Sequence, residues 1–165
     1  MSPGLRVSPG LRARLEALPR HSWRQDGQVP PFPDTRALIV FDGVCVLCSG
    51  FARFVAARDP QGQFLFTAAQ SPLGQGLFRH LGLDPVNYET NLLLAEGRVF
   101  AKMAAFGGIM ARLDRPWRLG AAVDGLPAAL ADGLYDRIAR NRYRLFGRRD
   151  ACILPDAGWR DRVIE

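Results

Sequence analysis

A Cys-x-x-Cys motif at the junction of a strand and a helix is the feature that most constrains the fold of this chain. The five apolar residues 37–41 (Ala-Leu-Ile-Val-Phe) precede it and are typical of a fully buried strand. The segment 49–58 follows it, with apolar residues at the spacing of one helix face. The sequence therefore places Cys45 and Cys48 where a buried strand ends and a helix begins.

This placement suits thiol-disulfide chemistry. Two cysteines separated by two residues can close a disulfide across the first helical turn, and the unpaired N–H groups of that turn favour a thiolate. We expect Cys45 to be the attacking thiol and Cys48 to resolve the mixed disulfide. With Val46 and Leu47 between them, the helix N-terminus is predicted to be the main local stabiliser of the thiolate. Metal sites use the same spacing, so a metal site is the alternative.

Composition limits the class of protein. The 165 residues suit one domain, and the 48% hydrophobic content is ordinary for a globular chain. No run of 18 apolar residues indicates a transmembrane helix. Arginines at positions 6, 12, 14 and 20 interrupt any apolar segment of a secretory signal, so we expect a cytoplasmic location. An odd count of three cysteines argues against a structural disulfide framework.

The formal charge of +6 comes almost entirely from arginine, because Lys102 is the only lysine. Arginines cluster within residues 140–149, interleaved with Tyr143 and Phe146. Two interpretations are open, a solvated helix end whose cations complement the helix dipole and a binding patch. Aromatic side chains between basic residues can stack nucleic-acid bases, but packing explains these aromatics more simply, since Leu134 and Ile138 share a helix stripe. Nucleic acid is therefore not an expected partner.

The order of predicted elements indicates an α/β chain. Residues 1–35 are interpreted as a partly irregular N-terminal extension, with a short helix near 11–18 and with Trp23 and Phe32 as tethers to the domain of residues 36–165. Beyond the first strand and helix, we predict these elements: a strand at 63–68, a helix at 72–83, a hairpin with strands at 91–95 and 98–102, a helix at 103–113, and a helix from Pro127.

This order of βαβ followed by ββα is that of a three-layer thioredoxin-like fold with extra C-terminal helices. In such a fold the first two strands run parallel, either adjacent or one apart, because the crossover is right-handed.

The residues 42–48 (Asp-Gly-Val-Cys-Val-Leu-Cys) resemble the Asp-Gly-x-Cys-x-x-Cys signature of the DCC family of thiol-disulfide oxidoreductases. The resemblance extends over roughly residues 36–155. It includes the segments 69–72 (Ala-Gln-Ser-Pro), 96–99 (Glu-Gly-Arg-Val), 135–143 (Tyr-Asp-Arg-Ile-Ala-Arg-Asn-Arg-Tyr) and 146–152 (Phe-Gly-Arg-Arg-Asp-Ala-Cys).

The resemblance implies a thioredoxin-like fold and dithiol-disulfide exchange at Cys45 and Cys48. Thioredoxins place a cis-proline just before the third strand, but the matching stretch 88–91 (Tyr-Glu-Thr-Asn) has no proline. A non-proline cis bond costs about 2.5–4 kcal/mol, so we expect a trans peptide and an altered substrate contact there. Family members commonly carry a small polar residue in the segment after the hairpin, where this chain has residues 102–104 (Lys-Met-Ala).

Two further residues have competing interpretations. Asp42 is favoured as a capping residue that accepts N–H bonds from the cysteine loop, and a proton-relay carboxylate is the alternative. Cys152 is interpreted first as a buried small side chain, then as a third redox cysteine, because Arg148 and Arg149 would lower the pKa of an exposed thiol. A metal site would need Cys152, His21 or His80 as additional ligands, which form no second close pair.

The sequence therefore predicts a thiol-disulfide oxidoreductase of the protein-disulfide reductase type, with Cys45, Cys48 and Asp42 as candidate catalytic residues. Its partner would be a disulfide-bearing protein or a small thiol, and an external reductant or oxidant would recycle the pair. No organic cofactor is implied, since neither standard glycine-rich phosphate loop is present. The alternatives are a non-catalytic binding module that uses the basic C-terminus, and a metal-binding protein.

Overall fold

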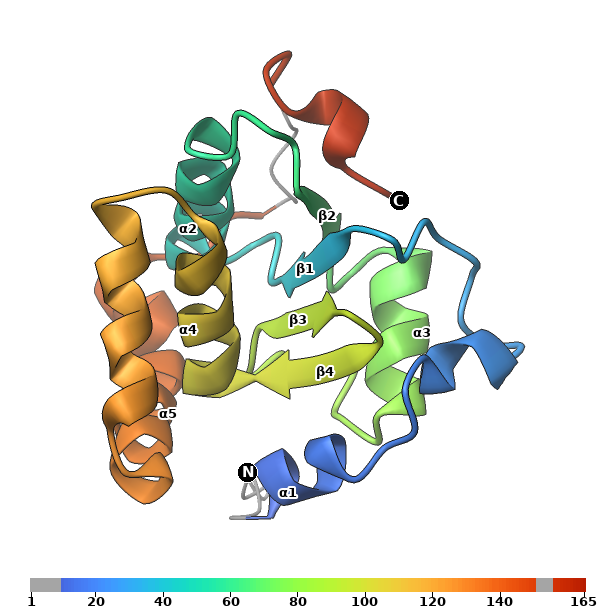
Figure 1. The fold of residues 1–165 in the computed structure, drawn as a ribbon, viewed down its shortest axis with the longest axis horizontal. Helices are drawn as coiled ribbons and strands as arrows, with labels where there is room; N and C mark the ends of the chain where they lie inside the picture. The colour runs from blue at the N-terminus through green and yellow to red at the C-terminus, as the bar shows by residue number, and fades with distance from the viewer. Residues whose placement is uncertain (1–9, 151–155) are drawn as a thin grey trace.

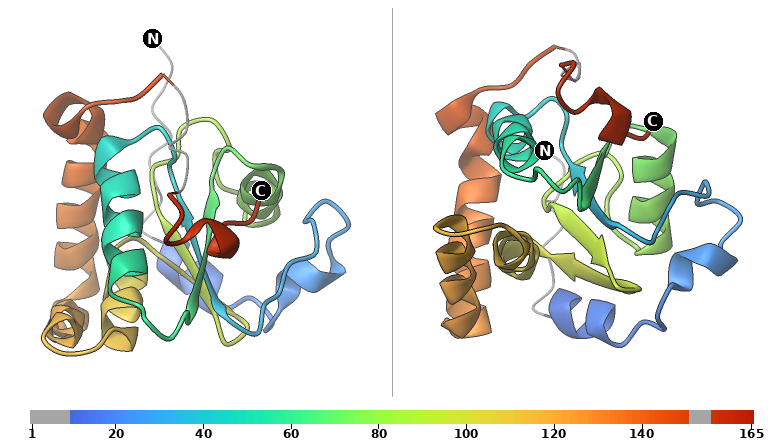
Figure 2. Two further views of the ribbon diagram at one scale, coloured as in Figure 1. Left: turned by 90° about the horizontal axis from the view of Figure 1, so that it is seen from above. Right: turned by 45° about the horizontal axis from the view of Figure 1, so that its top comes forward.

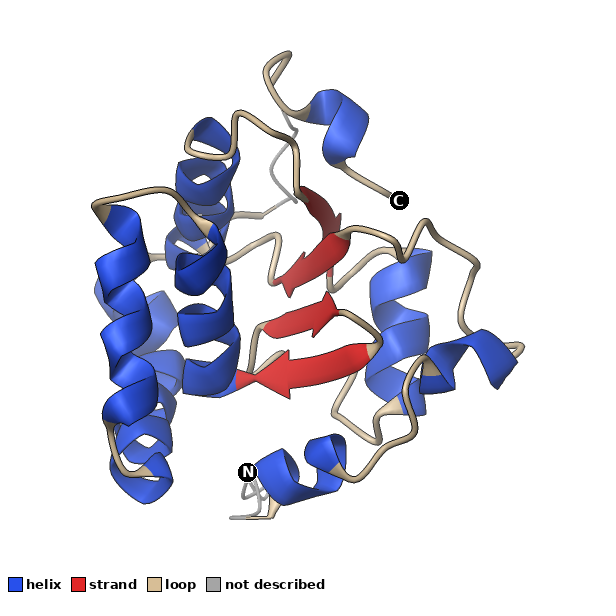
Figure 3. Ribbon diagram, viewed as in Figure 1, coloured by secondary structure: helices blue, strands red, loops and turns tan. Residues whose placement is uncertain are grey.

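The protein is described by a computed structural model in which residues 10–150 and 156–165 are placed. A four-stranded mixed sheet lies between two layers of helices (Figures 1 and 3). Its elements are α1 (Leu11–Glu16), η1 (Ser22–Gln25), β1 (Ala37–Phe41), α2 (Val46–Ala57), β2 (Phe64–Ala68), α3 (Pro72–His80), β3 (Leu92–Ala95), β4 (Arg98–Ala101), α4 (Lys102–Arg112), η2 (Trp117–Gly125), α5 (Ala128–Phe146) and η3 (Arg160–Arg162).

The sheet has the strand order β2-β1-β3-β4. β1 and β2 are neighbours and run parallel, with Ala37 opposite Phe64 and Phe41 opposite Ala68. β3 runs antiparallel to both β1 and β4. This βαβ–ββα arrangement confirms the predicted thioredoxin-like fold, including the parallel neighbouring strands.

Successive side chains of β1 point to opposite faces of the sheet, so this strand contributes to two cores. Leu38 and Val40 belong to the core under α3, and Ile39 and Phe41 to the core under α2 and α4. Figure 2 shows α2, α4 and α5 on one side of the sheet and α3 on the other. Because both faces are covered, the apolar run 37–41 has no polar alternation.

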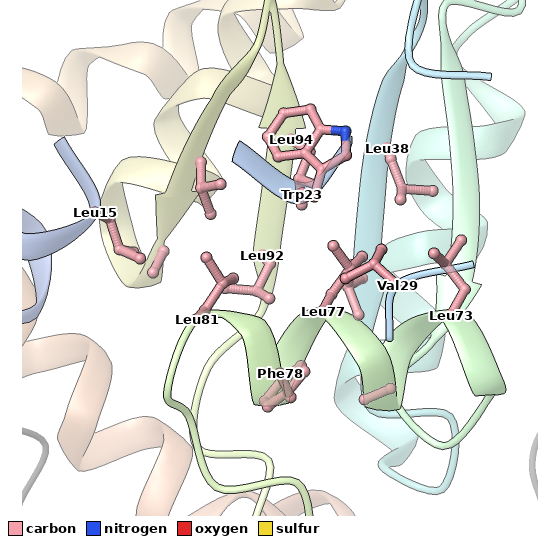
Figure 4. Close-up of a cluster of buried hydrophobic side chains, with 14 of the residues drawn as sticks. Leu15, Trp23, Val29, Leu38, Leu73, Leu77, Phe78, Leu81, Leu92 and Leu94 are labelled. Carbon is pink, nitrogen blue, oxygen red and sulfur yellow. The ribbon is translucent and has the colours of Figure 1, made fainter. Parts of the chain in front are cut away.

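The N-terminal residues pack into the core under α3. Leu11, Leu15 and Val29 are buried, and Trp23 lies over Leu94 in the close-up of this cluster (Figure 4). Trp23 is buried in this core, Phe32 packs against it, and the two rings stack with centroids 6.1 Å apart, so both aromatics hold the segment on the sheet as predicted. The division between an extension at 1–35 and a domain at 36–165 stays a prediction.

The two glycines that weaken the helical pattern of 72–83 are explained by close packing. A Cβ atom at Gly74 would lie 2.2 Å from the carbonyl oxygen of Ala68, and one at Gly76 would lie 2.5 Å from that of Gln28. α3 can therefore approach the sheet edge and the N-terminal segment only with glycine at these positions.

Two sequence-based expectations are corrected by the structure. Lys102, expected at the end of the hairpin, begins α4 and has a positive φ of 55°. Leu134 and Ile138 do lie on a helix, α5, but they are 51% and 39% exposed, so they are not part of a buried stripe. The buried residues of α5, which contacts α2 and α4, are Ala131 and Arg142.

Candidate active site

The Cys-x-x-Cys motif forms the first turn of α2. Cys45 is the N-cap residue, and its Sγ accepts a hydrogen bond of 3.2 Å from the backbone N–H of Cys48. Both cysteines carry free thiols. The strand-to-helix placement predicted for the motif is therefore present, with the Cys45 sulfur directed at the helix N-terminus.

The two thiols have opposite electrostatic environments. The pKa of Cys45 is lowered to about 7, chiefly because the Cys48 thiol donates a hydrogen bond to it. The Cys48 N–H and the Arg142 charge lower this pKa further, while burial and the Asp42 charge act against them. The pKa of Cys48 is strongly raised by the same hydrogen bond and by burial. Cys45 is thus the thiolate of the pair, although its neighbouring thiol has a larger effect than the helix terminus that we expected to dominate.

Asp42 lies at the end of β1 and is 2% exposed. Its Oδ1 accepts hydrogen bonds from the Val44 N–H at 3.1 Å and from Gln70 Nε2 at 2.6 Å. Gln70 in turn accepts the N–H of Gly43 through its Oε1 at 3.0 Å. The carboxylate therefore holds the loop before Cys45, while the helix N-cap itself is Cys45.

The second oxygen of Asp42 faces α5. Asp42 Oδ2 accepts a hydrogen bond from Arg142 Nη2 at 3.2 Å and another from the Tyr143 hydroxyl. The Arg142 guanidinium lies 4.4 Å from the centroid of the Tyr143 ring. The pKa of Tyr143 is raised to about 12, first by burial and then by its hydrogen bond to Asp42, so the phenol remains protonated as the donor.

Gln70, Arg142 and Tyr143 belong to the family motifs, and the last two also to the arginine-rich segment 140–149, but none of them was predicted as a site residue. The sequence feature that could have identified Arg142 as a site residue is its position within the 135–143 motif. Its charge alone would not, because a basic residue on an arginine-rich helix usually faces solvent.

The segment after α5 covers Cys45. Residue 45 pairs with Arg148 in an isolated antiparallel bridge, and the Arg149 N–H donates to the Val44 carbonyl at 2.8 Å. The Gly147 carbonyl accepts from the Val46 N–H at 3.4 Å. As a result the Cys45 side chain is fully buried, while Cys48 retains 7% exposure.

The stretch that corresponds to the thioredoxin cis-proline loop is also occupied from within the chain. Among the described residues the cis peptide bond is that between Arg115 and Pro116, so the bonds in 88–91 are trans, as expected. The Asn91 N–H donates to the Tyr135 hydroxyl at 2.9 Å, and Thr90 Oγ1 accepts the Lys102 N–H at 2.9 Å. Both backbone N–H groups are therefore used in hydrogen bonds within the protein.

The remaining candidate residues lie apart from the motif or outside the described chain. Cys152 lies outside the described residues. His21 contacts Asp34 at 3.2 Å, and His80 contacts Asp26 at 2.8 Å. In residues 10–150 and 156–165 no three His, Cys, Asp or Glu side chains are grouped so that they could hold a metal ion. Within these same ranges no helix has the length and apolar character needed to cross a membrane.

A thioredoxin-like sheet with a Cys-x-x-Cys at the start of α2 defines this chain as a dithiol protein of the thioredoxin-like class. The sequence profile of the DCC1-like thiol-disulfide oxidoreductases matches residues 39–148, and the chain belongs to this family. The family resemblance inferred from the motifs is therefore confirmed.

Two relatives support this assignment. The chain is 35% identical over 127 residues to the uncharacterized protein YuxK of Bacillus subtilis (strain 168), an alignment that covers 77% of this chain and 93% of that protein. It is 36% identical over 122 residues to the chloroplastic DCC family protein At1g52590 of Arabidopsis thaliana, covering 73% of this chain and 71% of that protein. No solved structure matches the chain.

Proposed function

We propose that the protein is a thiol-disulfide oxidoreductase of the protein-disulfide reductase type. The Cys45 thiolate attacks the disulfide of a protein or small-molecule partner, and Cys48 then resolves the mixed disulfide. The observation that carries this proposal is the Cys45 sulfur at the start of α2, where it accepts the Cys48 N–H at 3.2 Å. Its pKa of about 7 places substantial thiolate at neutral pH, near the optimum for an attacking thiol.

Asp42 has a positioning role in this proposal. Its carboxylate joins the loop before Cys45 to Gln70 on one side and to Arg142 on the other. Arg142 thereby brings its positive charge to the cysteine pair, where it lowers the pKa of Cys45. A proton relay through Asp42 is the competing role, and the Asp42→Asn variant described below separates the two.

The proposal requires access to Cys45. The cover over this residue consists of main-chain contacts from 147–149, and Arg148 and Arg149 at its end are exposed. Exchange with a protein disulfide at Cys45 therefore proceeds with this segment displaced.

The test is the alkylation rate of each cysteine in the reduced protein as a function of pH, with iodoacetamide as the reagent and peptide fragmentation to assign the site. We expect Cys45 to react with an apparent pKa near 7 and Cys48 to react slowly throughout. A Cys45 rate that rises only near pH 9, like that of an ordinary thiol, would remove the exchange mechanism.

The full burial of Cys45 favours a second candidate, a non-catalytic thioredoxin-like module that holds a partner through its basic C-terminal segment. Redox cycling separates the two functions. An oxidoreductase forms a Cys45–Cys48 disulfide that a dithiol reduces within minutes, whereas a binding module needs no such cycle. A cytoplasmic location and an external reductant remain parts of the proposal.

A further inference from the structure

A cavity of about 380 Å³ lies beside the cysteine pair, between α2, α4, α5 and the segment before β3. This volume is within the range of small-molecule sites. Most of its wall is apolar, formed by side chains that include Leu47, Phe51, Phe106, Ile109, Ile138 and Phe146. Such a wall accepts an aromatic or aliphatic body far better than a hydrophilic one.

Of the two cysteines, Cys48 is the one that forms part of this wall. Cys45 lies under the segment 147–149 and is fully buried. A molecule in the cavity therefore lies against Cys48, whereas a molecule that approaches from the side of 147–149 reaches Cys45 only when that segment is displaced. The cavity and the 147–149 side thus lead to different cysteines of the pair.

The charged groups of the cavity suit an incoming thiolate. Arg142 lines the wall, is 7% exposed, and has an Nε atom that is buried without a hydrogen-bond partner in the described structure. Its charge acts on both cysteines. Lys102 is neutralised by Asp136 at 2.8 Å, and burial raises the pKa of Glu89. Arg142 is also paired, with Asp42, but its charge lowers the pKa of both cysteines, so it is the group in this wall that stabilises negative charge next to Cys48.

We propose that the cavity binds an apolar small-molecule dithiol, which reduces the Cys45–Cys48 disulfide by attacking the sulfur of Cys48. This inference rests on the proposed function, because it supplies the reductant that returns the oxidised pair to the dithiol. It divides the two faces of the pair between the partners, with the disulfide substrate at Cys45 and the reductant at Cys48.

The chemistry favours attack at Cys48. One thiolate of the ligand attacks Cys48 Sγ, the protein S–S bond breaks, and Cys45 leaves as a thiolate held by the Cys48 N–H and the Arg142 charge. A disulfide is cleaved faster when the departing thiol has the lower pKa. The second thiol of the ligand then attacks the ligand sulfur of the mixed disulfide. A cyclic ligand disulfide is released, and Cys48 leaves with the proton of that second thiol.

The first experiment compares two dithiols as reductants of the oxidised protein, 1,2-benzenedimethanethiol and the hydrophilic dithiothreitol. Each rate is divided by the rate of the same dithiol with bis(2-hydroxyethyl) disulfide, which corrects for intrinsic reactivity. Acid quenching, maleimide labelling and intact-mass measurement give the reduced fraction. We expect the normalised rate of the aromatic dithiol to be at least tenfold higher and to saturate with concentration.

Matched variants test whether the preference for the aromatic dithiol arises from binding in the cavity. Ala139 lines the cavity and Ala129 is exposed on the same helix, so Ala139→Phe should abolish the preference and Ala129→Phe should keep it. Ile138→Trp, at a more exposed position of the wall, repeats the test with less demand on packing, and circular dichroism confirms that each variant is folded. A preference that survives both cavity variants in folded protein would overturn the inference.

The site of attack is read with a monothiol, phenylmethanethiol, whose mixed disulfide is trapped by acid and assigned by peptide fragmentation. An adduct on Cys48 supports the inference, and an adduct on Cys45 overturns it. If dithiothreitol and the aromatic dithiol act equally, the cavity inference fails while the proposed function stands. If no Cys45–Cys48 disulfide forms under oxidising conditions, both fail.

Discussion

Asp42 and Arg142 are 100 residues apart in the chain, yet they form a buried ion pair with Oδ2 and Nη2 at 3.2 Å. Their side chains are 1% and 8% exposed. The pair joins the loop before Cys45 to α5, so the electrostatic environment of the cysteine motif depends on a helix added after the βαβ–ββα core. Removing one partner of a buried pair leaves an uncompensated charge, which gives the pair measurable consequences.

Arg142→Met should both destabilise the protein and raise the pKa of Cys45. The substitution leaves the Asp42 carboxylate without its cationic partner, which lowers the free energy of unfolding by about 3 kcal/mol, measured by urea denaturation. The lost positive charge raises the pKa of Cys45, measured by alkylation. Arg144→Met, on the exposed side of the same helix, is the control and should change neither quantity. An unaltered Cys45 pKa in folded Arg142→Met protein contradicts the assigned role.

Asp42→Asn distinguishes a positioning carboxylate from a proton relay. The amide oxygen can still accept the Val44 N–H, so the cysteine loop keeps this contact, while the amide NH2 in place of Oδ2 cannot accept from Arg142 and the ion pair is lost. Loss of the negative charge should lower the pKa of Cys45, because that charge raises it in the wild type. The exchange rate at pH 7 should therefore be retained. A fall of tenfold or more in that rate, with an unchanged alkylation profile, would identify Asp42 as the relay.

The fold was largely readable from the sequence, because its signals are local. The run 37–41 and the alternation of turns and apolar segments identified the strands and most helices within a few residues of their observed ends. The error at Lys102 is also local in origin. Its positive φ of 55° ends β4 and starts α4 abruptly, and non-glycine residues adopt this conformation too rarely for a pattern to indicate it.

The candidate site was only half predictable. The thiol pair and its helix terminus follow from spacing, but the partners of Asp42 come from α5 and from Gln70, after β2. The spacing of Leu134 and Ile138 suggested a packed stripe that is largely exposed, because periodicity shows that a helix is amphipathic and does not show how far each side is covered. Burial of Arg142 depends on a carboxylate that the fold brings to it, which no local signal reports.

Arg149→Pro should expose Cys45 and, because burial raises the pKa of this thiol, should lower its pKa further. Proline lacks the N–H that donates to the Val44 carbonyl at 2.8 Å, so one main-chain contact of the cover is lost. The alkylation rate of Cys45, compared at equal thiolate fraction, should rise several-fold. Arg149→Ala keeps this N–H while removing the same side chain, so it should leave the rate unchanged. Equal rates in both variants would show that the 147–149 segment does not limit access.

Tyr135→Phe tests the link between α5 and the loop before β3. The hydroxyl accepts the Asn91 N–H at 2.9 Å, and burial raises the pKa of Tyr135 to about 12. The phenylalanine leaves this N–H without its partner, which should lower the free energy of unfolding by about 1–3 kcal/mol in urea denaturation. Leu134→Ala, at an exposed neighbouring position, should cost far less. An unchanged stability in Tyr135→Phe would mean that the Asn91 N–H finds another acceptor.

The reduced protein should become more stable as the pH rises from about 7 to 9.0, because the pKa of Cys45 is lowered from its ordinary 9.0 to about 7. In this window the unfolded chain still holds a proton that the folded chain has released, so the free energy of unfolding increases by at most about 1.4 kcal/mol per pH unit. Below pH 7 this contribution is lost.

Above pH 9 the raised pKa of Cys48 acts in the opposite direction, since the folded protein then keeps a proton that the unfolded chain releases. Urea denaturation under reducing conditions should show the rise and the later fall. The double variant Cys45→Ser/Cys48→Ser should show neither, and a rise of the same size in that variant would assign the effect to other groups.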